Sequence, residues 1–196
     1  RIPNTFRRLF SEGTFNAAFV PSYSSLNDNK KKSQKFANNI FTLLVIGLFF
    51  LVLIIEIMMP LFVFLIAPGF EGDYQKMELA ITLTRITFPF LMFISLASFF
   101  SAILNSHNKF AVASATPIIL NILLIGVLLF GKILNDELVY YLSYAVTISG
   151  ILQLIFLYFF VKKYLSLKIS LSFKIDNKVK LFFKKLLPSI FSSGVT

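Results

Sequence analysis

The sequence predicts an all-α fold, a polytopic transmembrane helix bundle, from three observations. Hydrophobic residues fill 57% of the 196 positions and the mean hydropathy is +0.80, whereas soluble domains are roughly half apolar. Only 14% of the residues are charged. Long apolar runs alternate with short polar breaks, and because lipid offers the backbone no hydrogen-bond partners, such runs are expected to be helices.

Four apolar runs are long enough to span a membrane, since a hydrocarbon core about 30 Å thick needs about 20 helical residues. They cover about residues 38–67, 77–104, 111–130 and 138–161. Residues 1–25 are interpreted as the end of an earlier helix that leaves the membrane, 162–178 as a loop, and 179–196 as an amphipathic start of a later helix. The chain begins without Met and ends within an apolar stretch, so we expect an internal fragment of a longer protein.

The charges are distributed unevenly between the loops. Lysine and arginine number 19 against 9 acidic residues, a net charge of +10. Lysines gather before the first run, at Lys109 after the second, and at Lys162 and Lys163 after the fourth, while the two intervening loops are mostly acidic. By the positive-inside rule the lysine-bearing loops are cytoplasmic. Pro60, Pro89 and Pro117 lie within apolar runs, where proline is expected to kink a helix.

Composition argues against an enzyme. The chain has no cysteine and one histidine, His107, so we expect no metal site and no cofactor. Neither a nucleophile elbow, nor a phosphate-binding glycine loop, nor a catalytic cluster of carboxylates and histidine is present. A transporter or a binding subunit is therefore favoured.

Two arginines near the N-terminus are the first candidates for a functional site. Arg7 and Arg8 stand among apolar residues, and Glu12 lies one helical turn beyond Arg8. A guanidinium stays charged and fits phosphate or carboxylate in a bidentate manner. From spacing alone, two interpretations are open: one arginine faces a cavity and holds an anion, or both extend to the cytoplasmic interface while Glu12 pairs with Arg8.

Glu56 and Arg85 are the second candidates, because each lies inside an apolar run. Counted from the turn between the first two runs, both fall at similar depth on antiparallel neighbours. The spacing therefore allows an ion pair across this helix hairpin, which we interpret as structural.

Several segments together resemble a known family. PNTFRRLFSEGTFNAAFVP, APGF, ITFPFLMFISLASFFSAILNSHNKF, ATPIILNI and AVTISGILQL follow one another along the whole chain. In this order and spacing they are similar to the MurJ (MviN) family of lipid II flippases, within the multidrug/oligosaccharidyl-lipid/polysaccharide exporter superfamily. The resemblance covers the end of the second transmembrane helix to the start of the seventh.

The resemblance implies a two-lobed bundle, of which this chain is part of the N-terminal lobe, around a cavity that opens alternately to each side. It implies transport of lipid II, the undecaprenyl-diphosphate-linked peptidoglycan precursor, across the bacterial cytoplasmic membrane. The family's cavity arginine falls in a motif matched here by Pro3, Asn4, Arg7 and Arg8. By this resemblance Arg7 is the position expected to bind the lipid diphosphate, and Arg8 is a secondary candidate expected to support the rim with Glu12.

The partners expected from this resemblance are lipid II, membrane lipids and the cell-wall synthesis machinery, with no nucleic acid. Three other functions remain open. An exporter of the same superfamily could move another polyprenyl-linked saccharide or a drug, although a cavity arginine favours an anionic substrate. A scaffold subunit would have a filled helix interface without a cavity beside Arg7. An integral membrane enzyme acting on polyprenyl phosphates would need the catalytic residues that the sequence lacks.

Overall fold

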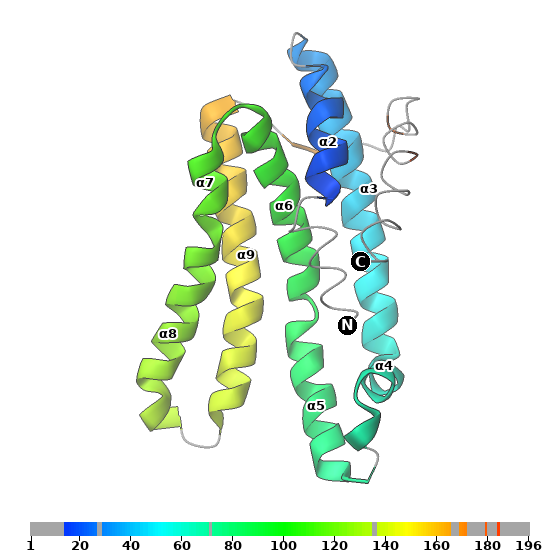
Figure 1. The fold of residues 1–196 in the computed structure, drawn as a ribbon, viewed down its shortest axis with the longest axis vertical. Coiled ribbons are helices and arrows are strands. Elements are labelled where there is room, and N and C mark those ends of the chain that lie inside the picture. The colour runs from blue at the N-terminus through cyan, green and yellow to red at the C-terminus, as the bar shows by residue number, and fades with distance from the viewer. Residues whose placement is uncertain are drawn as a thin grey trace.

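The computed structural model describes residues 14–26, 29–70, 72–134, 137–165, 169–171, 179 and 184. Within these residues the regular elements are all helical and strands are absent, so the predicted fold class is confirmed. Figure 1 shows an elongated bundle whose long helices run roughly along one axis. The described elements are α2 (Thr14–Ser24), α3 (Lys30–Ile57), α4 (Met59–Ile66), the 3-10 turn η1 (Pro68–Phe70), α5 (Tyr74–Thr87), α6 (Phe90–Ser106), α7 (Phe110–Ser114), α8 (Thr116–Leu134) and α9 (Leu138–Leu165).

Four helical stretches in the described part of the chain are long and apolar enough to cross a membrane: Lys30–Ile57, Tyr74–Ser106, Phe110–Gly131 and Leu138–Leu165. The first begins earlier than the apolar run because Asn29 caps it. The Asn29 side chain accepts a hydrogen bond of 3.1 Å from the backbone N–H of Lys32, which satisfies one of the free donors at the start of a helix. The capped turn therefore extends the helix through the lysine-rich segment.

Three of the predicted spans are interrupted, each beside one of the prolines. α3 ends before Met58 and Pro60 lies in the first turn of α4; α5 ends before Pro89; α7 and α8 meet at Ala115, next to Pro117. Proline lacks the N–H that would bond the carbonyl four residues earlier, and its ring clashes with that carbonyl. The helices are thus interrupted at the three positions where kinks were predicted.

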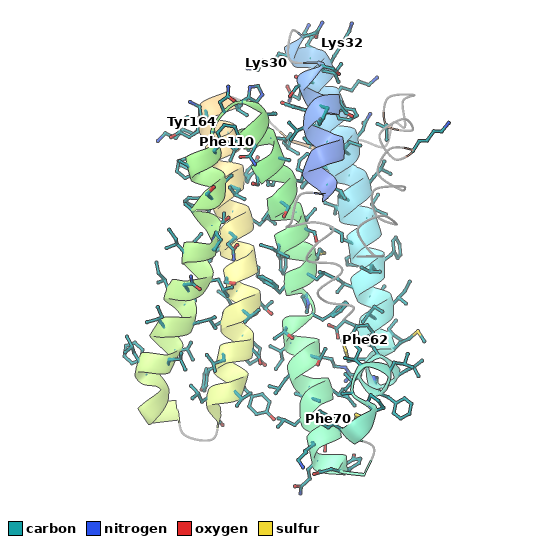
Figure 2. The ribbon with its side chains drawn as sticks, viewed as in Figure 1. Lys30, Lys32, Phe62, Phe70, Phe110 and Tyr164 are labelled. Carbon is teal, nitrogen blue, oxygen red and sulfur yellow. The ribbon has the colours of Figure 1, made fainter. Side chains whose placement is uncertain are left out.

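The basic loops lie at one end of the bundle. Figure 2 places Lys30 and Lys32 at the same end as Phe110 and Tyr164, which neighbour Lys109 and Lys163 in sequence, and places Phe70 at the opposite end. We call the first the basic end and the second the distal end. This arrangement agrees with a cytoplasmic basic end under the positive-inside rule.

The main core joins α2, α3, α6 and α9 and is rich in aromatic side chains. Phe15, Phe19, Phe99 and Ile40 are at most 1% exposed within it. A second, smaller core near the distal end consists of Met59, Phe62 and Val63, with partly buried side chains from α5 against it. The larger core therefore holds the basic half of the bundle together, and α4 with α5 closes the other end.

α9 occupies the centre of the packing, between α6 and α8 (Figure 1). Its contact with α6 depends on small residues, as expected between membrane helices. A Cβ atom on Gly150 would lie 2.8 Å from Cδ2 of Phe90 and 3.1 Å from Cβ of Phe93. Only glycine allows this approach without displacement of the rings.

Candidate functional site

The residues predicted to bind the lipid diphosphate lie outside the described residues. These are Arg7 and Arg8, together with the supporting Pro3, Asn4 and Glu12. Their roles stay predictions. The structure does describe α2, the helix that follows this segment directly, and the surfaces against which α2 packs.

α2 is held by a row of aromatic side chains at helical spacing. Phe15, Phe19 and Tyr23 follow one another every four residues and are 0–1% exposed. The Phe15 and Phe19 rings stack with centroids 5.3 Å apart, and the Phe19 and Tyr23 rings with centroids 5.4 Å apart. Phe19 also meets Phe99 of α6 edge-on at 5.2 Å and Phe36 of α3 at 5.9 Å. Aromatic pairs in these geometries add about 0.5–1.5 kcal/mol each beyond burial, so α2 is firmly fixed to its neighbours.

The row ends at the single histidine. The Tyr23 and His107 rings lie edge to face with centroids 5.8 Å apart. Among the described residues, Nε2 of His107 is buried without a hydrogen-bond partner, and burial lowers the pKa of this imidazole below its ordinary value. Burial thus favours the neutral imidazole, which contributes packing at the end of α6.

Glu56 of α3 and Arg85 of α5 are near enough for the Arg85 charge to act on the Glu56 carboxylate. Within the part of the chain that the structure describes, one carboxylate oxygen of Glu56 is buried without a hydrogen-bond partner. The direct ion pair between the two residues stays a prediction.

Each of these charged residues stands one helical turn before a proline. Glu56 precedes Pro60 by four residues, and Arg85 precedes Pro89 by four. The backbone carbonyl of each residue therefore cannot accept the usual helical bond, because its partner would be the missing proline N–H. This repeated spacing, a charged residue four positions before a proline, can be read from the sequence, but the comparison of helix depths used to pair Glu56 with Arg85 does not reveal it. It places both charges at the helix interruptions.

The interruption between α5 and α6 is supported by α9. The Thr147 hydroxyl donates a short hydrogen bond to the backbone carbonyl of Ile86. A polar side chain on a neighbouring helix thus satisfies a carbonyl next to the break, as membrane proteins require. Thr147 lies on the same side of α9 as Gly150, one turn away, so close approach and hydrogen bonding act together at this break.

At the basic end, the segment after α9 is tied back to α3. The side-chain amide of Asn38 donates to Oγ of Ser170 at 3.0 Å, and the Ser170 N–H donates to Oδ1 of Asn38 at 3.2 Å. The neighbouring Asn39 is 1% exposed, and neither of its amide atoms has a hydrogen-bond partner among the residues that the structure describes. Of the two asparagines, Asn38 is the one that connects segments distant in sequence.

Comparison with known proteins gives the same family from both sequence and structure. The family model described as lipid II flippase MurJ matches residues 1–196. A probable lipid II flippase MurJ of Rickettsia prowazekii is 38% identical over 198 residues, covering 100% of this chain and 38% of the relative. The chain belongs to the lipid II flippase MurJ family.

Further relatives agree with this membership. A probable lipid II flippase MurJ of Rhizobium tropici is 36% identical and also covers the whole chain. A solved structure of a lipid II flippase MurJ, in an inward closed conformation, matches with a TM-score of 0.72 at 26% identity and covers 99% of this chain. The chain spans 38% of the length of these two relatives and 39% of that solved chain. As a member of this family with four membrane-spanning stretches, it is a multi-pass protein of the bacterial cytoplasmic membrane.

Proposed function

We propose that the protein to which this chain belongs moves lipid II across the cytoplasmic membrane by alternating access, as a transporter and not an enzyme. The observation that carries the proposal is the family match over residues 1–196, supported by relatives named as lipid II flippases. In this proposal the four spans are the third to sixth helices of the N-terminal lobe, and the cell-wall synthesis machinery is the partner that uses the product.

Arg7 is the residue we assign to the diphosphate of lipid II, with Arg8 in a secondary role and Pro3, Asn4 and Glu12 as support. A guanidinium can donate two parallel, charge-assisted hydrogen bonds to phosphate oxygens. What favours a functional role is the placement of this segment directly before α2, whose aromatic row packs on α3 and α6. Such anchoring would hold an adjacent anion-binding group in position.

The test is complementation of cells depleted of their own flippase with the full-length protein, combined with a direct lipid II flipping assay. A hydrogen bond to a charged group contributes about 1.5–3 kcal/mol, so Arg7→Ala should reduce flipping by roughly ten- to a hundredfold. Lys31→Ala is the matched control, because it removes one charge from the exposed start of α3, and it should flip normally.

The outcomes separate the assignments. Failure of the unsubstituted protein to flip lipid II, despite normal insertion, would reject the proposed substrate and favour another exporter of the superfamily or a scaffold. Normal flipping by Arg7→Ala at equal membrane abundance would keep the flippase and reject Arg7 as the diphosphate-binding residue.

A further inference from the structure

Two lysines from different elements gather on one tyrosine ring at the basic end. Nζ of Lys109, in the loop between α6 and α7, lies 5.1 Å from the ring centroid of Tyr164. Nζ of Lys163, in the last turn of α9, lies 5.8 Å from the Tyr164 centroid and 5.8 Å from that of Phe160. Both distances lie within the range of cation–π attraction. Both ammonium groups are therefore held against the same tyrosine ring.

The backbone holds Lys109 in this position. Asn108 adopts a left-handed conformation, with φ of 60°. The N–H of Lys109 bonds the carbonyl of Leu104 at 2.9 Å, and the N–H of Asn108 bonds that of Asn105 at 3.0 Å. These two bonds form a Schellman motif, in which asparagine is the common alternative to glycine. Lys109 therefore follows a well-defined helix end.

Neither amine is neutralised within the described part of the chain, where the structure records no salt bridge from Lys109 or Lys163. Lys163 is favoured by its place in the last turn of α9, where a helix attracts cations. Lys109 stands just beyond α6 and packs across to another helix. An anion bound beside this ring would be attracted by both amines, and the Tyr164 hydroxyl could donate a further hydrogen bond.

The surroundings of the two amines are apolar and exposed. Phe110 and Phe159 are 55% and 57% exposed, and Figure 2 shows Phe110 near Tyr164 at the basic end. Along α9 the rings of Phe156, Phe160 and Tyr164 follow one another, with centroid separations of 4.8 and 5.6 Å. This row leads from the membrane-spanning part of α9 to the lysines. The arrangement fits a ligand with an anionic head and apolar chains.

We propose that Lys109, Lys163 and Tyr164 bind the phosphate of an anionic glycerophospholipid in the cytoplasmic leaflet, with its acyl chains against Phe110 and Phe159. The chemistry shared with other ligands is the phosphate group. A phospholipid is the occupant we choose because the amines lie where apolar rings are exposed and where the basic loops meet the anionic cytoplasmic surface. The site is independent of the proposed transport of lipid II.

The experiment is native mass spectrometry of the full-length protein with added phosphatidylglycerol or phosphatidylcholine of the same acyl chains. We expect retention of phosphatidylglycerol over phosphatidylcholine. The double variant Lys109→Gln/Lys163→Gln should retain about tenfold less phosphatidylglycerol, because each lysine near an anionic lipid surface contributes to the attraction. Lys30→Gln/Lys32→Gln removes the same charge from the same end (Figure 2) and should change retention less than about twofold.

Three results would overturn the proposal. The first is an equal loss of phosphatidylglycerol retention in the two double variants, which would mean attraction by net charge alone. The second is equal retention of both lipids by the unsubstituted protein, and the third is displacement of phosphatidylglycerol by inorganic phosphate or by equimolar lipid II. Lys109→Arg/Lys163→Arg keeps both charges and should restore retention. If the glutamine variant fails to fold, Tyr164→Leu gives the same test and should lose phosphatidylglycerol retention. Full retention in both Tyr164→Leu and the arginine variant would reject a site centred on the Tyr164 ring. Lipid retention is measured without flipping, so a failed lipid II assay leaves this test intact.

Discussion

The two ends of the bundle are built differently and largely from different helices. At the basic end, aromatic residues of α2, α3 and α6 are almost fully buried, with Phe19 at 0% and Phe36 at 4% exposure. Toward the distal end, α3 gives way to α4 at Met58 and α5 to α6 at Pro89. The core there has three buried residues, of which Met59 is 0% exposed.

The difference teaches where the chain can deform. A continuous helix packed through aromatic rings resists bending, whereas a proline break removes a backbone hydrogen bond and makes a bend inexpensive. The charges of Glu56 and Arg85 and the hydroxyl of Thr147 gather at the breaks. We therefore expect the aromatic core of α2, α3 and α6 to move as a unit and the breaks to absorb changes of shape.

The largest effect should come from removal of a ring in the basic core. Phe19→Ala would leave a cavity among Phe15, Tyr23, Phe36 and Phe99. Such a substitution costs about 3–5 kcal/mol. We expect that loss in the free energy of unfolding of the full-length protein, measured by denaturant titration in detergent.

Phe159→Ala is the control, because that ring is 57% exposed. It should cost less than about 1 kcal/mol. Similar losses for the two variants would show that the aromatic core is not what distinguishes the basic end.

The second effect tests the close packing of α6 on α9 beside the break. In Gly150→Ala the new methyl would meet Phe90 and Phe93, and overpacking of this kind costs about 1–3 kcal/mol. Gly126→Ala in α8 is the matched control, since nothing lies within 4 Å of the added atom there. Alanine is a better helix former than glycine by up to about 1 kcal/mol. The melting temperature should therefore fall for Gly150→Ala and rise or stay level for Gly126→Ala; the reverse order would contradict the packing.

The fold could be predicted because it depends on features that are visible locally in the sequence. Apolar runs, their lengths and the lysine asymmetry are local properties, and they suffice for four spans and a common basic end. Proline positions give the breaks for the same reason. The bond from Thr147 to the carbonyl of Ile86 joins residues 61 apart, so no local pattern could reveal it.

The candidate site was less accessible from the sequence. Similar depth on antiparallel helices suggests that Glu56 and Arg85 can meet, but depth leaves the direction of each side chain undetermined, so their ion pair stays a prediction. The gathering of Lys109 and Lys163 on Tyr164 depends on the left-handed backbone of Asn108 and on the packing of α7 beside α9. Arg7 and Arg8 stand out in the sequence as charges among apolar residues, and the family motif suggests their role, but they lie outside the described residues.

A smaller effect concerns the attraction at the distal breaks. Because the Arg85 charge acts on the Glu56 carboxylate and Arg85 itself is exposed, a double-mutant cycle of Glu56→Gln and Arg85→Gln should give a coupling energy of roughly 0.5 kcal/mol. Breaking a direct buried pair would cost about 3–5 kcal/mol. The cycle is measured by denaturant unfolding of the four proteins. A coupling of that larger size would establish the direct pair in place of the longer attraction.

The smallest effect compares two helix caps, one from each end. Asn29 and Asp73 have the same backbone angles, φ −131° and ψ 95°, and each accepts a hydrogen bond of 3.1 Å from a backbone N–H three residues on. They differ in charge. The Lys76 ammonium lies 2.8 Å from a carboxylate oxygen of Asp73, and this contact, followed by the Lys76 backbone N–H, lowers the pKa of that carboxyl below its ordinary value.

A lowered pKa means that the cap stabilises α5 above the pKa of an unfolded aspartate, near 3.9. The stabilisation is lost as the pH falls through the lower folded value. Hydrogen exchange at pH 7 and pH 3, corrected for the intrinsic rate, should show faster opening of the first turn of α5 in acid and no change in the first turn of α3. Asp73→Asn should keep α5 protected and abolish the pH dependence, since asparagine caps as well as aspartate does. Equal acid sensitivity of both first turns, or its persistence in Asp73→Asn, would assign it to the helices in general and not to this carboxylate.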